Sequence, residues 1–158
     1  MSADPAPSTN AGGPMSIFPA FVARPQIRWS DQDILGHVNN AMIVTLVEQA
    51  RIDWLNTMRD RDAINRPKLV ARVELNYRAP VHHGPELRIE LGIGRVGTSS
   101  FSITNRGIQN GTLVFEGLNV LVVLDRETGK PAPISEADRA FLRQFGTFDP
   151  ENPAAGIE

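Results

Sequence analysis

Two stretches in the middle of the chain show the residue spacing of β-strands. From 69 to 77, apolar residues occupy every second position and polar or charged residues lie between them. The same alternation returns from 87 to 93, and a period of two predicts strands that bury one face. A polar strand at 99–109 and a longer strand at 112–124 should follow. An Asn-Gly dipeptide at 110–111 joins them and favours a two-residue β-hairpin turn.

One long segment, from Ala41 to about Met58, has helical spacing instead. Its first two turns carry almost no charge before Glu48, and a helix that is apolar nearly all round is expected to be wrapped by other structure. Either Asn39 or Asn40 can serve as its N-cap. The chain therefore holds one long buried helix among strands.

Weaker signals complete the element order. A strand is expected at 21–29, before the long helix. Within the strand at 112–124, the inward-facing positions change phase near Glu116-Gly117, which predicts a β-bulge there. Ser135 is the expected N-cap of a short helix that reaches about Phe145, with Asp138 at its third position.

A strand, a buried helix and four strands with hairpin-length connections predict an α+β fold, in which a curved antiparallel sheet of about five strands wraps around the helix. One helix cannot cover so wide a sheet, and pairing of two chains is the simplest way to cover the apolar remainder. We expect one domain at 16–147, with disordered tails at 1–15 and 148–158, because the first tail is rich in Pro, Gly, Ser and Ala.

Composition excludes several classes of function. The 158 residues contain no cysteine, so a catalytic thiol, a disulfide frame and an iron–sulfur cluster are excluded. A net charge of −2 gives no general attraction to nucleic acid. No segment is apolar over the length of a membrane span, and the N-terminal segment lacks the features of a signal peptide. These features predict a cytoplasmic protein that binds neither nucleic acid nor membrane.

The segment 27–40 carries the most chemistry. It places Asp31, Asp33, His37, Asn39 and Asn40 just before the long helix. Carboxylates are favoured beside the positive end of a helix, and the free N–H groups there can stabilise an oxyanion. Such a set of groups is suited to acyl hydrolysis. The alternative is that these side chains only cap the loop and the helix.

The run from Arg28 to Asp33, continued by Gly36-His37-Val38-Asn39-Asn40, resembles the signature of 4-hydroxybenzoyl-CoA thioesterase-like hotdog proteins. Segments 47–55 and 77–81 match its continuation, and the resemblance covers about residues 21–145. It implies a hotdog fold, an acyl-CoA thioesterase activity without a cofactor, and a homodimer or homotetramer with its active site at the subunit interface.

The resemblance also implies roles for single residues. Asp33 aligns with the catalytic carboxylate, which acts either as a nucleophile on the thioester or as a general base on water. His37 would position water or stabilise the transition state. Glu48 is a reserve catalytic acid, because some hotdog thioesterases use an acid on the helix; the alternative is a buried pair with Arg51.

Further residues are expected to bind the substrate. Asn39 and Asn40 serve mainly as cap and loop ties, while neighbouring N–H groups hold the thioester oxygen. The segment 95–101 resembles the hairpin that reaches the coenzyme A phosphates, and polar turn chemistry alone is the alternative. Its candidate ligands are Arg95, Thr98, Ser99 and Ser100. No metal site is expected, because the adjacent His82 and His83 point in different directions and have no acidic or Cys partner at a fixed spacing.

Two other functions compete with hydrolysis. An enoyl-thioester hydratase of the same fold has a longer step from Asp to His and a proline in the segment, whereas here four positions lead from Asp33 to His37 without a proline. A non-catalytic acyl-CoA-binding protein would have lost the acid that is present here. The acyl group, coenzyme A versus acyl carrier protein, and dimer versus tetramer stay open.

Overall fold

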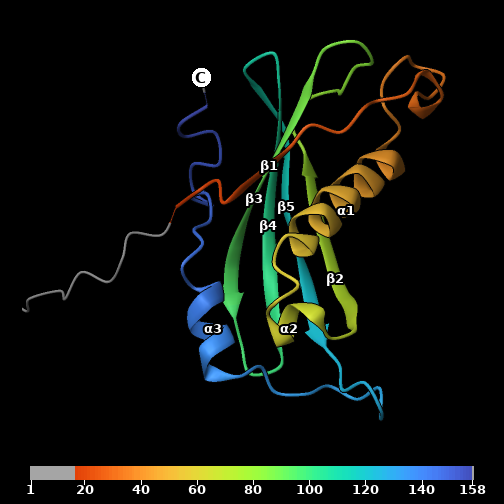
Figure 1. The fold of residues 1–158 in the computed structure, drawn as a ribbon. Coiled ribbons are helices and arrows are strands. Elements are labelled where there is room, and N and C mark those ends of the chain that lie inside the picture. The colour runs from red at the N-terminus through yellow and green to blue at the C-terminus, as the bar shows by residue number, and fades with distance from the viewer. Residues whose placement is uncertain (1–16, 158) are drawn as a thin grey trace, which may run out of the picture.

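A computed structural model describes residues 17–157, and its centre is one antiparallel sheet of five strands (Figure 1). The strand order is β1-β3-β4-β5-β2, and each neighbouring pair runs antiparallel. Strands β3, β4 and β5 are neighbours in sequence and in space, as hairpin-length connections require. The strands are β1 (Phe21–Ala23), β2 (Lys68–Tyr77), β3 (Leu87–Val96), β4 (Ser100–Gln109) and β5 (Thr112–Val123).

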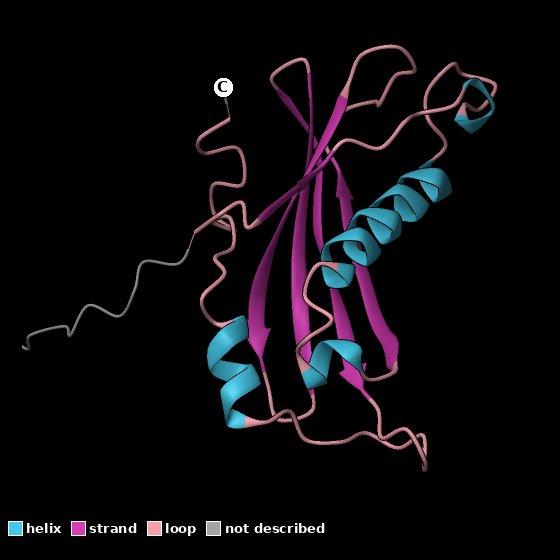
Figure 2. Cartoon of the chain, viewed as in Figure 1, coloured by secondary structure: helices cyan, strands magenta, loops and turns pink. Residues whose placement is uncertain are grey.

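The long helix α1 (Asn40–Asn56) lies across one face of this sheet (Figure 2). Its residues Ile43, Val47 and Trp54 are buried, and they join the inward side chains of the strands in one core. The ring of Trp54 also stacks on Phe21 of β1. A curved antiparallel sheet around one helix, with a short helix near the C-terminus, is the hotdog fold that the sequence predicts.

The outer face of α1 differs from the prediction of a helix wrapped on all sides. Val44, Glu48 and Ile52 are exposed along it. The near absence of charge in the first turns therefore does not reflect burial within one chain. An apolar helix face left open in this way is typical of a surface that another chain covers.

Strand β2 shows the same discrepancy. The alternation at 69–77 predicts a buried apolar face, but Leu69, Val73 and Tyr77 are all exposed. The reason is that β2 forms an edge of the sheet and pairs only with β5. Its alternation is also interrupted, because Val70 faces Leu121 and Arg72 faces Val120, so that one extra residue forms a bulge in β2.

The hairpin between β4 and β5 confirms the predicted turn and corrects the predicted bulge. Asn110 has φ of 51° and Gly111 has φ of 71°, the left-handed values that a type I′ turn requires. The bulge lies closer to the turn than Glu116-Gly117, because Gly107 faces Phe115 and Ile108 faces Leu113, which leaves Val114 unpaired. The sheet thus regains its regular register before the predicted position.

Strand β1 is shorter than the predicted strand at 21–29. Only three residues pair with β3, and the chain then leaves the sheet. Residues 29–31 form a single 3-10 turn instead of the end of a strand. This early exit carries the polar segment away from the sheet edge and toward the start of α1.

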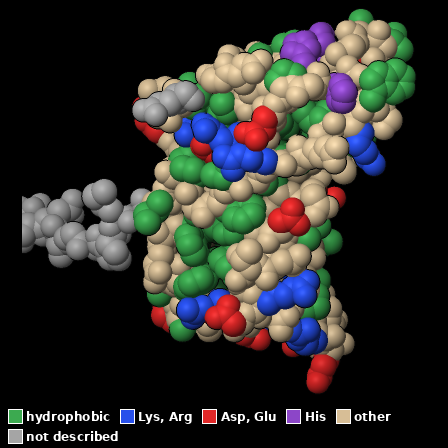
Figure 3. Space-filling model, turned by 45° about the horizontal axis from the view of Figure 1, so that its top comes forward, with side chains coloured by type: hydrophobic (Ala, Val, Ile, Leu, Met, Phe, Trp, Pro, Cys, Tyr) green, Lys and Arg blue, Asp and Glu red, His purple; other side chains and the backbone are tan. Residues whose placement is uncertain are grey.

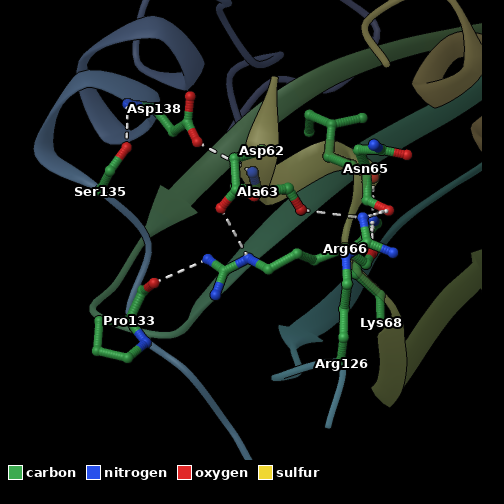
Figure 4. A network of polar contacts seen from close by, with 10 residues as sticks. Asp62, Ala63, Asn65, Arg66, Lys68, Arg126, Pro133, Ser135 and Asp138 are labelled. Atoms are coloured by element: carbon green, nitrogen blue, oxygen red, sulfur yellow. Dashed lines mark hydrogen bonds and ion pairs between the residues drawn. The ribbon is translucent and has the colours of Figure 1, made fainter. Parts of the chain in front are cut away.

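Two short helices close the other end of the molecule through a polar network (Figure 4). The carboxylate of Asp138 accepts a hydrogen bond from the main-chain N–H of Ala63 at 2.9 Å, which joins α3 (Glu136–Leu142) to α2 (Asp62–Asn65). Ser135 caps α3 by accepting from the N–H of Asp138, as predicted. The network fixes the start of β2, which follows directly.

Lys68, the first residue of β2, belongs to the same network. Its ammonium group donates to the main-chain carbonyls of Ala63, Ile64 and Arg66 and so caps the end of α2. Burial lowers the pKa of Lys68 to about 8, and the positive charges of Arg126 and Arg66 act in the same direction. The lysine therefore has a structural role at this end of the sheet.

The C-terminal segment after α3 runs along the sheet face opposite α1. Phe148 is buried, and the guanidinium of Arg106 donates to the carbonyls of Pro153 and Ala155 at 2.8 Å. Gly92 permits the close approach, because a Cβ there would lie 1.9 Å from the carbonyl oxygen of Gly146. The predicted disordered tail at 148–158 stays a prediction, but its described part, 148–157, contacts the sheet. The predicted tail at 1–15 lies outside the described residues.

Candidate active site

The loop before α1 is built on a buried carboxylate. Asp31 is 2% exposed and accepts hydrogen bonds from the main-chain N–H of Arg28 at 2.8 Å and from its Nε at 3.2 Å. Its carbonyl accepts from the N–H of Asn39 at 2.8 Å. Burial raises the pKa of Asp31, but the bonds and the positive charge from Arg28 outweigh burial and hold this pKa below its usual value. Asp31 is therefore an ionised carboxylate with a structural role in this loop.

Replacement of Asp31 by Asn should lower the free energy of unfolding by about 1–3 kcal/mol at neutral pH, because a buried charge-assisted hydrogen-bond set is lost. The folded-state pKa of Asp31 is depressed, so its contribution is present above the unfolded pKa and fades as pH falls below about 4. Urea unfolding of wild type and variant, at neutral pH and at about pH 3, measures the loss of unfolding free energy at each pH. Asp53→Asn, at an exposed helical carboxylate, is the control. An equal loss at both pH values would contradict this role.

Asp33, two residues later, has the opposite surroundings. It is exposed, and its Oδ1 accepts from the N–H groups of Leu35 at 2.8 Å and His37 at 3.4 Å. The N–H of Asp33 donates to the carbonyl of His37 at 2.8 Å, and Gly36, with φ of 77°, permits the tight turn between them. Within residues 17–157, Oδ2 accepts no hydrogen bond, so one carboxylate oxygen is available to a substrate or water.

The start of α1 supplies dipoles to the same place. The side chain of Asn39 caps the helix by accepting from the N–H of Ala41 at 2.8 Å. The main-chain N–H of Asn40 has no hydrogen-bond partner among the described residues, and the hydroxyl of Tyr77 donates to the Asn40 carbonyl at 3.0 Å. The exposed first turn of a helix favours negative charge and can bind an oxyanion.

One cleft of about 450 Å³ is lined by Asp33, Asn39, Asn40 and Tyr77. Asp33 and His37 line it together with the chain after β2, at 78–81. The apolar part of the lining consists of Leu35, Val38, Ile43, Ala79, Pro80 and Val81. The structure therefore brings together Asp33, His37, Asn39 and Asn40, four of the residues singled out in the sequence.

A second cleft, of about 470 Å³, gathers the other candidates at the turn between β3 and β4. Arg95, Thr98, Ser99 and Ser100 all line it, together with Arg72 of β2. One guanidinium from each of two strands and several hydroxyl groups suit a phosphate. The two clefts lie at opposite ends of the sheet, because the first adjoins the end of β2 and the second adjoins its start.

Glu48 does not reach either cleft within one chain. It lies two turns along the exposed face of α1, its side chain is 55% exposed, and it pairs with Arg51 at 3.0 Å. The pair with Arg51 that the sequence allowed is present, but only Arg51 is buried.

Two side chains at the cleft were not singled out for chemistry in the sequence. Tyr77 lines the cleft and ties α1 to β2, and an aromatic residue at the end of an alternating strand was the available signal. His82 was considered only as a metal ligand, yet its ring contacts that of His37. Figure 3 shows histidine side chains gathered at one end of the molecule. Residues 17–157 contain no group of three or more His, Cys, Asp or Glu side chains that could hold a metal ion.

Fold and cleft together define a hotdog protein with a carboxylate at the start of its central helix, and comparison with known proteins agrees. The thioesterase-like superfamily profile matches residues 27–145. A thioesterase from Thermus thermophilus, with a crystal structure complexed with coenzyme A and Zn, is 35% identical in sequence to this chain. The two structures superpose with a TM-score of 0.70, and the match covers 82% of this chain and 95% of that chain. The chain belongs to the thioesterase-like superfamily.

Two further relatives extend the comparison. The structure of a predicted thioesterase from Bacillus stearothermophilus is 27% identical, with a TM-score of 0.72 over 80% of this chain and 96% of that chain. The uncharacterized protein YsmA of Bacillus subtilis (strain 168) is 28% identical over 127 residues, which is 78% of this chain and 85% of YsmA. In the part of the chain that the structure describes, no helix is long and apolar enough to cross a membrane.

Proposed function

We propose that this protein hydrolyses an acyl thioester of coenzyme A to the free acid and the thiol. The observation that carries the proposal is the position of Asp33, which lines a cleft at the exposed first turn of α1 and whose Oδ2 accepts no hydrogen bond within residues 17–157. The 35% identical Thermus thioesterase binds coenzyme A, which supports the leaving group. The cysteine-free composition is in keeping with a cytoplasmic enzyme.

Two routes lead from Asp33 to the products. In one, Oδ2 attacks the carbonyl carbon, the carbon–sulfur bond breaks and the thiolate leaves. Water then splits the mixed anhydride into the free acid and the Asp33 carboxylate, and the proton that this releases converts the thiolate to the thiol. In the other, Oδ2 takes a proton from water, the resulting hydroxide attacks, and the proton ends on the departing thiolate. Both routes place negative charge on the carbonyl oxygen, which the N–H of Asn40 and the helix dipole can stabilise. His37 orients the attacking water.

The complete site is proposed to form between two chains. Strand β2 has a free edge, and the apolar residues Leu69, Val73 and Tyr77 are exposed along it. Such an edge readily pairs with another strand. A two-fold axis through β2 would pair the strand with its own copy in antiparallel fashion. The end of one β2 would then lie beside the start of the other, which brings the Asp33 cleft of one chain toward the Arg95 cleft of its partner.

Free-thiol release from a panel of acyl-CoAs tests the proposed reaction, with straight-chain, branched and aromatic acyl groups as substrates. Saturable release with at least one member supports hydrolysis. Tight binding of acyl-CoA without thiol release would overturn the enzymatic function in favour of a binding protein. Loss of the enoyl absorbance of an enoyl-CoA, without thiol release, would instead indicate hydration.

A further inference from the structure

The imidazole of His37 contacts a second imidazole, that of His82. The rings of His37 and His82 lie 5.1 Å apart between centroids, at 86° to each other, an edge-to-face contact. His37 lines the cleft with Asp33, whereas His82 is not part of the lining. His82 is exposed and touches the cleft only through its ring contact with His37, so it can act on the reaction only through that residue.

The ring of His37 has little else to fix its orientation. Among the hydrogen bonds of residues 17–157, His37 takes part only through its main chain, whose N–H and carbonyl both bond to Asp33. These bonds set the Cα position but leave the side chain free to rotate. A side chain without such a constraint populates several rotamers, so the contact with His82 selects among them.

His82 itself is firmly held at its main chain. The buried side chain of Gln109, 4% exposed, accepts from the N–H of His82 at 2.9 Å. The same amide donates to the carbonyls of His82 at 2.9 Å and Pro85 at 3.0 Å. The N–H of Val38 also donates to the carbonyl of Val81 at 2.8 Å, which joins the two loops. A buried amide at the end of β4 thus fixes the main chain of His82 beside the cleft loop, where its ring meets that of His37.

We propose that His82 is a positioning residue for thioester hydrolysis, which holds the imidazole of His37 beside the carboxylate of Asp33. The inference rests on the proposed function. Its neighbour His83 provides a matched comparison, because both histidines are exposed on the same loop but His83 has no ring contact among the described residues. The loop position alone therefore does not confer the role.

His82→Ala should lower kcat by about tenfold to a hundredfold with KM unchanged, because a displaced His37 affects the reacting geometry and not the coenzyme A contacts. The Gln109 bonds use the main chain of residue 82, so the loop anchor is kept. His82→Phe, which keeps the edge-to-face contact, should restore most of the lost kcat. His83→Ala should lower kcat far less, because His83 acts on the loop only through the smallest of the charge effects on Asp31. Equal activities of His82→Ala and His83→Ala, or a His82→Phe variant as slow as His82→Ala, would overturn the proposal.

A double-mutant cycle separates positioning from a general weakening of the loop. If His82 acts through His37, then His82→Ala should cause no further loss in a His37→Ala background. Additive losses would overturn the proposal. The chain has three histidines, so the ring signals in the NMR spectrum of untagged protein are readily assigned by substitution. The His37 signals should shift or broaden in His82→Ala but not in His83→Ala, and unchanged signals would count against positioning.

Asp33→Asn, measured in the same series, distinguishes failure of this inference from failure of the proposed function. Wild-type turnover that requires Asp33 but ignores His82 overturns the role of His82 alone. Turnover that survives Asp33→Asn overturns both, because His37 would then have no carboxylate partner in the reaction.

Discussion

Replacement of Asp33 by Asn should lower kcat for acyl-CoA hydrolysis by about 10²–10⁴-fold, the range expected when a group that takes or donates a proton is lost. An amide oxygen can still accept from the N–H groups of Leu35 and His37, so the loop keeps its shape. The amide can neither attack the thioester nor take a proton from water. Initial rates of thiol release measure the loss of kcat, and far-UV circular dichroism checks that the variant stays folded.

Two carboxylate controls sharpen this result. Asp53→Asn alters an exposed acid on α1 that bonds only to Gln49 among the described residues, and it should leave kcat unchanged. Glu48→Gln tests the reserve acid, which pairs with Arg51 outside the cleft. A large loss in Glu48→Gln with near-normal turnover in Asp33→Asn would transfer the chemistry to the helix and contradict the role given to Asp33.

Val73→Glu should separate the chains and abolish most of the activity, although Asp33 is untouched. Val73 is 49% exposed near the middle of β2, so a two-fold axis through this strand would bring the two new carboxylates close together. Like charges facing each other across an interface cost several kcal/mol. Light scattering should show monomers at micromolar concentration. The value of kcat/KM should fall at least about 100-fold, because each cleft loses its facing residues.

Ile17→Glu is the matched control for this variant. Ile17 is also apolar and exposed, at 71%, but it lies beyond the opposite edge of the sheet, next to β1. This substitution should change neither the oligomeric state nor kcat/KM. A Val73→Glu protein that stays dimeric, or that becomes monomeric and keeps full activity, would contradict a site shared across β2.

The regular parts of the fold could be predicted from the sequence because local pattern and tertiary burial agree there. Strand β3 alternates cleanly and buries Leu87, Ile89 and Leu91 against α1. The Asn-Gly turn needs no tertiary information, since only its two residues must adopt positive φ. The cap of α3 by Ser135 is equally local.

The prediction was wrong where apolar positions lie open within one chain. The alternation of β2 is as clear as that of β3, but β2 lies at an edge, so its apolar face is open within one chain. The uncharged first turns of α1 likewise predict burial on all sides, but the outer face of the helix is exposed. A single sequence reports which surfaces are apolar, and it does not say whether the same chain or another one covers them.

The residues of the candidate site also differ in whether the sequence alone could predict them. Asp33, His37, Asn39 and Asn40 lie within eight residues of one another, so one loop brings them together. His82 comes from a distant loop, and its link to His37 depends on Gln109 at the far end of β4. No local signal in the sequence connects those two loops.

Mixing two inactive variants tests the central claim, that Asp33 of one chain acts on a thioester whose coenzyme A phosphates bind at the β3–β4 turn of its partner. Asp33→Asn lacks the acid, and Arg95→Glu should block the phosphate cleft. After unfolding, mixing and refolding, half of the dimers contain both variants, and each of these has one intact site. The mixture should regain about a quarter of wild-type activity per chain. A mixture no more active than the two variants measured separately would contradict the shared site.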